Sequence, residues 1–246
     1  MNQHSFQKAY YDSFCDVGGQ VWVFPKGGGL PFRKPTTWCT AETNFQSAAL
    51  EKAQADVIES PGIKALRNLS AGKQSDSEFD ATLQWIALHL IRGQKMRDVV
   101  AKSGDDYEQR FPKEFESELL YLKTRYSTAY TYTCGGAGFF VTSDNPIVEV
   151  GNPPERLLLF ALSPQKFVRL SSEPGELTIE GTGFEDFANA MTCSTASKYI
   201  YSHRKDVDTD KYRRIAQKHA MLPQLETEEI VLRDFSGKIA SQFPQK

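Results

Sequence analysis

The sequence has few cysteines and none of the spacings that cysteine chemistry requires. Its four cysteines, Cys15, Cys39, Cys134 and Cys193, are far apart and form neither a CxxC pair nor a His-x-Cys pair. Zinc sites and disulfide frameworks are recognised by closely spaced ligands or by many cysteines in a short chain. The sequence therefore predicts four reduced thiols. The signatures of phosphate-binding loops, dinucleotide sites and zinc proteases are also absent.

Long apolar runs and an excess of one charge are missing too. No stretch approaches the ~18 apolar residues of a transmembrane helix, and the first residues lack the basic and apolar regions of a signal peptide. The formal net charge is −2, so the chain as a whole exerts no strong attraction on nucleic acid or on an anionic membrane. These absences predict a cytoplasmic protein with no membrane partner. Any nucleic-acid site would have to be a local patch.

The composition is that of an ordinary globular protein, with 246 residues, 40% hydrophobic and 24% charged. Helical periodicity dominates residues 45–125, and strand patterns dominate the chain after residue 126. We therefore expect an α+β fold in a single domain, residues 1–246, with a mixed, largely antiparallel sheet packed on a helical subdomain. Residues 1–134 would hold an N-terminal hairpin and helices, and residues 135–246 a β-rich half with a C-terminal helix.

Individual elements can be predicted from local patterns. Residues 20–24 and 36–39 have the pattern of a hairpin, and Pro61-Gly62 is expected to end the helix that begins near residue 45. Residues 83–91 are apolar around nearly the whole helical circumference, which predicts a central buried helix. Further strands are predicted at 138–142, 157–162, 166–171, 177–180, 198–202 and 228–232, and further helices at about 113–125, 184–196 and 209–219.

One cluster of short polar side chains follows the apolar residues 138–141. It consists of Thr142, Ser143, Asp144 and Asn145 and is closed by Pro146. Ser, Asp and Asn bond their own backbone and accept turn geometry, so one interpretation is a plain turn. The other interpretation is a site, because functional groups collect in loops at the ends of strands on a rigid sheet.

The predicted central helix also carries polar residues. His89 and Arg92 lie on one face, whereas Arg97 falls on the other side. A desolvated guanidinium needs carboxylate, phosphate or carbonyl partners. We therefore expect one of these arginines to pair with Glu51 or Glu59 of the preceding helix. Such a pair would be structural, or the arginines would bind phosphate; His89 would be a core histidine, a ligand or a base.

A basic band with interleaved tyrosines marks the last third of the chain. Basic and aromatic residues together suit a phosphate backbone with unstacked bases. Three aspartates, Asp206, Asp208 and Asp210, interrupt the band, which equally fits a solvated face. The basic residues are Lys198, His203, Arg204, Lys205, Lys211, Arg213, Arg214, Lys218 and His219, and the tyrosines are Tyr199, Tyr201 and Tyr212.

Several of these motifs together resemble a bacterial protein family, the domain of unknown function 4238 family. The resemblance rests on His4, the run at 21–24, Glu42, the helix with Arg92, and above all residues 140–146, and it spans about residues 4–203. The sequence departs from the family pattern at Gln7, Tyr11, His89 and Gly93-Gln94. The resemblance implies a polar pocket formed by His4, Glu42, Glu51, Glu59, Arg92, Arg97, Ser143, Asp144 and Asn145.

The leading functional prediction is a hydrolase, specifically a nuclease in phage defence or toxicity. Its catalytic residues would be His4, Glu51, Glu59, Arg92 and Asp144. Of these, Asp144, Glu51 and Glu59 would bind Mg²⁺ or Mn²⁺, and no organic cofactor is indicated. Substrate binding is assigned to a second set, namely Glu42, His89, Arg97, Ser143 and Asn145.

The alternative is a non-catalytic module. It would bind nucleic acid or another phosphate-bearing ligand, or a protein partner from a defence system. The geometry of the carboxylates distinguishes the two hypotheses. Two carboxylates within about 5 Å and open to solvent would permit a metal, whereas carboxylates that are each paired with an arginine would not.

Overall fold

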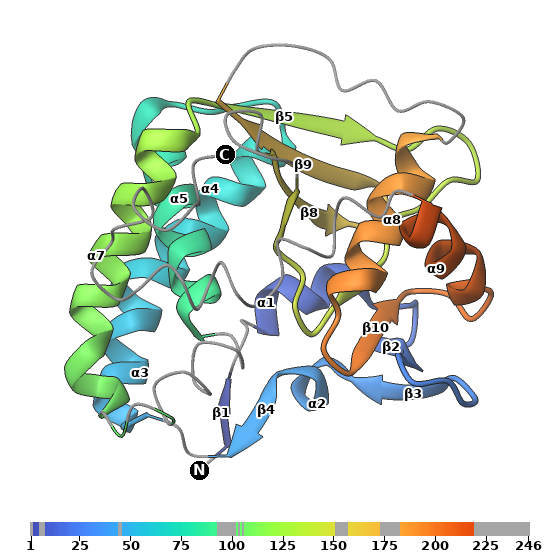
Figure 1. The fold of residues 1–246 in the computed structure, drawn as a ribbon, viewed down its shortest axis with the longest axis horizontal. Helices are drawn as coiled ribbons and strands as arrows, with labels where there is room; N and C mark the ends of the chain where they lie inside the picture. The colour runs from blue at the N-terminus through green and yellow to red at the C-terminus, as the bar shows by residue number, and fades with distance from the viewer. Residues whose placement is uncertain are drawn as a thin grey trace, which may run out of the picture.

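The computed structural model describes residues 2–4, 8–43, 46–92, 102, 104, 106–150, 157–172 and 183–218. It confirms the α+β class. Within these ranges, two four-stranded antiparallel sheets and a two-stranded sheet lie beside a layer of helices (Figure 1). The predicted single sheet is therefore divided in two. No helix in the described ranges is long and apolar enough to cross a membrane.

The first sheet joins distant parts of the chain. Its order is β3 (Phe32–Pro35), β2 (Gln20–Pro25), β10 (Tyr199–Ser202) and β6 (Thr142–Ser143). Trp22 is paired with Ser202, and Phe24 with Ile200. Because side chains alternate along strands, these four residues share one face of the sheet. That face is directed toward α8 (Phe184–Thr195) and α9 (Thr209–Lys218).

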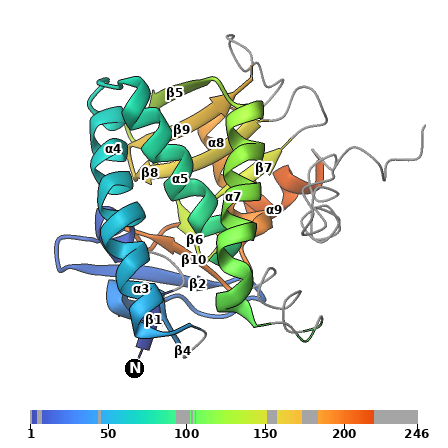
Figure 2. The ribbon, with the colours of Figure 1, turned by 90° about the vertical axis from the view of Figure 1, so that its left-hand side faces the viewer.

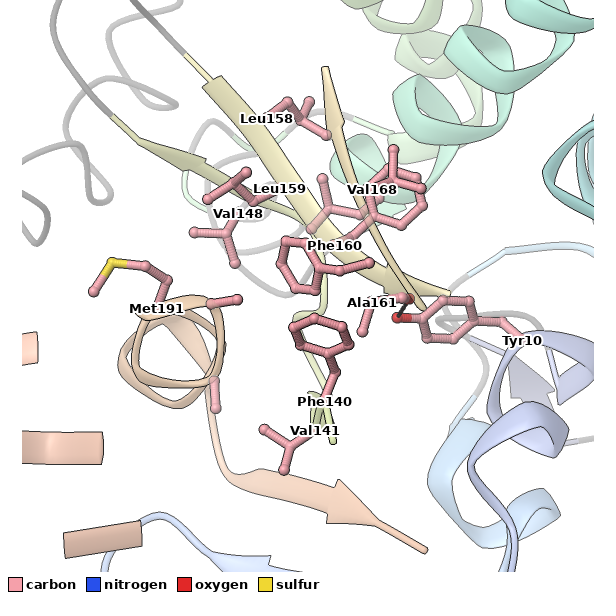
Figure 3. Close-up of a cluster of buried hydrophobic side chains, with 14 of the residues drawn as sticks. Tyr10, Phe140, Val141, Val148, Leu158, Leu159, Phe160, Ala161, Val168 and Met191 are labelled. Atoms are coloured by element: carbon pink, nitrogen blue, oxygen red, sulfur yellow. Dashed lines mark hydrogen bonds between the residues drawn. The ribbon is translucent and has the colours of Figure 1, made fainter. Parts of the chain in front are cut away.

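The second sheet supplies most of the apolar core. Its order is β5 (Thr128–Thr133), β9 (Lys166–Ser171), β8 (Leu157–Ser163) and β7 (Val148–Val150). Leu158, Phe160 and Val168 are completely buried. Figure 3 shows them in the same buried cluster as Phe140 and Met191 of α8. The second sheet, α8 and residues 140–141 therefore share one continuous core.

The helical layer packs against the second sheet (Figure 2). It contains α3 (Ala48–Gln54), the π-helical turn η2 (Ala55–Glu59), α4 (Ser60–Ser70), α5 (Asp76–Arg92) and α7 (Tyr107–Arg125). Trp85, Ile86 and Leu88 of α5 are completely buried. The prediction of a central buried helix is therefore confirmed.

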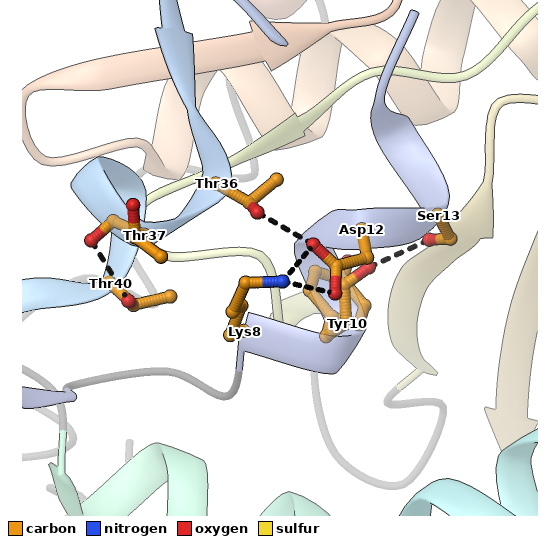
Figure 4. A network of polar contacts seen from close by, with 7 residues as sticks. All are labelled: Lys8, Tyr10, Asp12, Ser13, Thr36, Thr37 and Thr40. Carbon is orange, nitrogen blue, oxygen red and sulfur yellow. Dashed lines mark hydrogen bonds and ion pairs between the residues drawn. The ribbon is translucent and has the colours of Figure 1, made fainter. Parts of the chain in front are cut away.

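Near the N-terminus, short elements are connected by polar contacts. Strand β1 (Asn2–His4) pairs with β4 (Ala41–Thr43), and α1 (Lys8–Tyr11) continues into η1 (Asp12–Phe14). The Asp12 carboxylate accepts hydrogen bonds from the Lys8 ammonium at 2.7 and 2.8 Å. It also accepts one from the Thr36 hydroxyl at 2.6 Å (Figure 4). These contacts join η1 to α2 (Thr36–Thr40).

Two predictions of local structure are wrong. Residues 36–39 belong to helix α2 rather than to a strand, because the pairing of β3 with β2 ends at Pro35. Pro61-Gly62 does not end the helix, which continues to Ser70. Proline is tolerated in the first turn of a helix, and Pro61 is the second residue of α4, which follows the π-helical turn that ends at Glu59. Gly62 is needed for packing, because a Cβ there would lie 2.5 Å from the Trp85 Cβ.

The predicted strand at 138–142 is only partly correct. Phe140, Val141 and Thr142 are buried as expected, whereas Gly138 is exposed and Phe139 is half-buried, and only Thr142 and Ser143 pair with another strand. The strands predicted at 157–162, 166–171 and 198–202 are confirmed. The helices predicted at 184–196 and 209–219 are confirmed to within one residue over the described part of the chain, whereas the helix predicted at 113–125 begins six residues earlier, at Tyr107. The strands predicted at 177–180 and 228–232 lie outside the described residues.

The contact between Gly62 and Trp85 gives a first testable prediction. Gly62→Ala should lower the free energy of unfolding by about 1–3 kcal/mol, although alanine has the higher helix propensity. The reason is that the new methyl would meet the Cβ of Trp85, which cannot rotate away. Urea denaturation would measure the change. Gly27→Ala is the matched control, because a Cβ there meets no atom within 4 Å; equal stability of both variants would contradict the prediction.

Candidate functional site

Among the predicted site residues whose side chains the structure describes, Arg92 is the most deeply buried charged residue. It is 1% exposed. Its Nε donates to Gln54 Oε1 at 2.8 Å, one terminal nitrogen donates to the same oxygen, and the other forms an ion pair with Glu59 Oε1. The predicted pairing of a central-helix arginine with a carboxylate of the preceding helix is therefore confirmed for Arg92 and Glu59.

The π-helical turn η2 explains how Gln54 and Glu59 reach one guanidinium. In a regular α-helix, residues five positions apart point about 140° away from each other. A π-turn closes its hydrogen bonds between residues five apart and so brings them closer to one face. The Ser60 amide indeed donates to the Ala55 carbonyl, five residues earlier. The unusual backbone therefore permits the buried ion pair.

Two other predicted residues belong to the same two helical segments, His89 to α5 and Glu51 to α3. His89 is 4% exposed, and its ring contacts the Trp85 ring at a centroid distance of 4.4 Å. Glu51 is half-buried in the first turn of α3. It precedes Glu59 by eight residues, which corresponds to roughly 12 Å along a helix axis.

The Asp144 carboxylate is bound by backbone amides. Its oxygens accept hydrogen bonds from the amides of Ser197 at 2.8 Å, Lys198 at 2.7 Å and Tyr199 at 3.2 Å. Burial raises the pKa of Asp144, and the three amide N–H groups act in the opposite direction. The carboxylate therefore connects residue 144 to the turn between α8 and β10.

The neighbours of Asp144 make structural contacts as well. The Asn145 side-chain amide donates to the Thr195 carbonyl at 3.1 Å, at the end of α8. The Ser143 hydroxyl accepts from the Asn145 amide at 3.2 Å, and the Ser143 carbonyl accepts from the Tyr11 hydroxyl at 3.0 Å. The N-terminal segment thus packs against this strand through Tyr11. All three residues at 143–145 stabilise the junction of α8, β6 and β10.

The remaining predicted residues are placed only in part. His4 and Glu42 lie in the paired strands β1 and β4, where Gln3 is opposite Glu42 and His4 is opposite Ala41. Their side chains lie outside what the structure describes, and so does Arg97. Among the described residues, no group of three or more His, Cys, Asp or Glu side chains could hold a metal ion. Asp144, Glu51 and Glu59 are therefore not assembled as one set of ligands.

A different group of residues combines positive charge with aromatic rings. The Arg33 guanidinium carbon lies 5.8 Å from the centre of the Trp22 ring, and the Lys205 ammonium lies 5.6 Å from it. Both distances are typical of cation–π contacts. Trp22 is half-buried on β2, Arg33 lies opposite it on the edge strand β3, and Lys205 is exposed after β10.

A second aromatic ring extends this group. The Arg204 guanidinium carbon lies 4.7 Å from the centre of the Phe139 ring, and the His203 ring lies 5.7 Å from it. Partial burial and then the charge of Arg204 lower the pKa of His203, whereas Asp206 raises it. The Trp22 surface, as we name it, consists of Trp22, Arg33, Phe139, His203, Arg204 and Lys205.

The sequence indicated part of this surface and missed the rest. His203, Arg204 and Lys205 belong to the predicted basic band, but Tyr201 and Tyr212 of that band are buried. Trp22 and Arg33 are separated from the band by more than 160 residues. Only the antiparallel pairing of β2 with β10 brings them together. The sequence offered one indication of this surface, namely an aromatic residue, Trp22, and a basic residue, Arg33, within the predicted hairpin.

The buried ion pair gives a second prediction. Removing either partner alone should cost about 3–5 kcal/mol, because the other charge is left buried. A double-mutant cycle with Glu59→Ala and Arg92→Ala, followed by urea denaturation, should reveal strong coupling. Lys52 and Asp56 are the matched control, since they form an exposed pair on the same helical run and should show little coupling. Similar coupling energies in both cycles would contradict the prediction that the buried pair contributes more than the exposed pair.

The contacts of Asp144 give a third prediction. Asp144→Asn should lower the free energy of unfolding by about 1–3 kcal/mol, because the new NH₂ group cannot accept a hydrogen bond from a backbone amide. Asp208→Asn is the control. Asp208 accepts from the Lys211 amide at 2.7 Å, and asparagine caps a helix as well as aspartate does. If Asp144→Asn and Asp208→Asn changed the free energy of unfolding equally, the contacts of Asp144 with the backbone amides would not contribute to stability, and the prediction would be wrong.

No family model, no curated protein and no solved structure matches this chain in the three comparisons.

Proposed function

We propose that this protein is a binding module for single-stranded nucleic acid and that the strand lies on the Trp22 surface. This is the non-catalytic alternative of the sequence analysis, with its anionic ligand specified. The observation that carries the proposal is that cations contact two aromatic rings, Trp22 on β2 and Phe139 three residues before β6. Proteins bind single strands by stacking bases on such rings and by neutralising phosphates nearby.

The side chains have the freedom that this task needs. Lys205 is exposed and has a flexible four-carbon stem. Its ammonium can move from the Trp22 ring to a phosphate while a base stacks on the ring. The guanidinium of Arg204 is itself planar and stacks on bases as well as on Phe139.

The local charge is modest, which determines the kind of binding expected. Arg33 forms an ion pair with Asp16 at 2.5 Å, and Arg204 forms one with Asp206. Three cations therefore face two acids across the surface. With a small positive excess, stacking rather than charge should supply most of the affinity, and the dependence on salt should be shallow.

The predicted carboxylates give less support to the nuclease hypothesis. Glu59 is paired with Arg92, and the Asp144 oxygens accept three amide N–H groups. Both arrangements satisfy the negative charge within the protein. Cleavage with Mg²⁺ or Mn²⁺ and a role in phage defence stay predictions from the sequence, and the experiment below can test the cleavage.

The test compares variants of the Trp22 surface in binding to a labelled single strand. Trp22→Leu should weaken binding roughly 5- to 100-fold, because it removes the ring but keeps an apolar side chain. Lys205→Gln should weaken it less and reduce the salt slope by about 0.7, the value for one phosphate contact. Fluorescence anisotropy at salt concentrations of about 50 to 200 mM would measure the affinity and its dependence on salt.

The control is Lys64→Gln, which removes an exposed cation from α4 in the helical layer. It should bind like the wild type. Absence of binding by the wild type, or equal weakening by Lys64→Gln and Lys205→Gln, would refute the proposal. Incubating the strand with Mg²⁺, Mn²⁺ or EDTA tests the alternative, since metal-dependent cleavage that Asp144→Asn abolishes would establish the nuclease instead.

A further inference from the structure

A small pocket lies on the same face of the first sheet as Trp22. It is formed where Pro25 at the end of β2 and Ile200 of β10 meet α8 and α9. Cys193 of α8 and Ala216 of α9 complete its apolar wall, and Thr209 and Arg213 lie at its rim. Its volume is about 170 Å³.

The size and lining of the pocket suit a single flat ring. A dry apolar cavity of about 150 Å³ is large enough to bind benzene. Burial raises the pKa of the Cys193 thiol to about 12, so this wall is uncharged at neutral pH. The Thr209 hydroxyl and the Gln217 amide can donate and accept hydrogen bonds at the pocket edge. An apolar slot with a few polar groups at its edge is typical of a specific ligand site.

The sheet register places this pocket next to the Trp22 surface. Ile200 precedes Ser202 by two residues on β10, and Ser202 is paired with Trp22. Two residues span roughly 7 Å along a strand. Residues 206–208 then connect Lys205 of the Trp22 surface to Thr209 at the rim of the pocket. A ligand that lies across Trp22 can therefore extend into the pocket.

Two cations at the rim are held in place by internal contacts. The Lys26 ammonium donates to the carbonyls of Ser194 at 2.7 Å and Ala196 at 2.6 Å, which leaves the third of its three N–H groups for another acceptor. Arg213 forms an ion pair with Asp210 at 2.5 Å and donates to the Lys26 carbonyl at 3.5 Å. These positive groups at the mouth complement the phosphate that accompanies a base.

From size, lining and position together, we infer that this pocket receives one unstacked pyrimidine base of the strand bound on the Trp22 surface. The inference rests on the proposed function and adds base selectivity to it. A single-ring base matches the volume, whereas a purine carries a second ring. Stacking on Trp22 accepts any base, so the pocket would be the element that distinguishes one base class from the other.

The experiment compares oligo(dT) with oligo(dA) of equal length in binding to the full chain. The wild type should prefer oligo(dT) by at least ~5-fold, a difference within reach of one well-filled pocket. Ala216→Leu fills the pocket and should abolish this preference while leaving oligo(dA) binding unchanged. Trp22→Leu should weaken binding of both strands. Ala53→Leu, an exposed change on α3, is the control for adding leucine.

The outcomes distinguish a failure of the pocket inference from a failure of the proposed function. If Trp22→Leu weakens both strands but the wild type shows no preference, or Ala216→Leu retains it, the pocket inference is overturned and the proposed function stands. If the wild type binds neither strand, the proposed function itself fails. Should Ala216→Leu not fold, Thr209→Val replaces it, since it removes one rim hydroxyl at nearly constant shape. A preference unchanged by Thr209→Val would then overturn the inference.

Discussion

The packing of this protein depends on residues 139–145, which cross the interior and bring polar backbone groups into it. A buried amide or carbonyl without a partner costs as much as a lost hydrogen bond. Asn189 of α8 supplies two partners, because its side chain accepts from the Val141 amide and donates to the Phe139 carbonyl, both at 2.8 Å. The Phe140 amide donates to the Pro164 carbonyl at 2.7 Å. The Asn189 side chain and the Pro164 carbonyl therefore supply the hydrogen-bond partners that a neighbouring strand usually supplies.

The same segment ties the two sheets to the N-terminal elements. The Tyr10 hydroxyl donates to the Ala161 carbonyl in the second sheet at 2.7 Å and shares a hydrogen bond with the Thr142 hydroxyl in the first sheet at 2.9 Å. Figure 3 shows this tyrosine beside Ala161 at the edge of the core. With Asp144 bound to the turn before β10, the polar groups of the segment are engaged in holding elements together. The chemistry that we propose lies on the outer part of the first sheet instead.

The sequence determined much of the fold because local patterns and burial agree along most elements. The apolar circumference of residues 83–91 could only be buried, and a buried arginine at the end of that helix had to find an acid. Both expectations are confirmed, the second by Arg92 with Glu59. The cluster at 143–145 was interpreted either as a plain turn or as a site, and its contacts with the end of α8 and the turn before β10 are those of a structural junction. In contrast, the helix continued through Pro61, because a π-helical turn and close packing on Trp85 override the local signal.

The sequence by itself thus determined the fold class and the central helix, and it predicted that Arg92 or Arg97 pairs with Glu51 or Glu59, since each follows from periodicity and from the cost of burying charge. Only the tertiary structure decided which carboxylates remained available and which cations met which rings. Trp22 and Lys205 are 183 positions apart in the chain, and no local pattern records the register that places them in contact. Antiparallel pairing of distant strands is a cooperative property of the whole core, and for that reason the proposed binding surface could be located only in the folded protein.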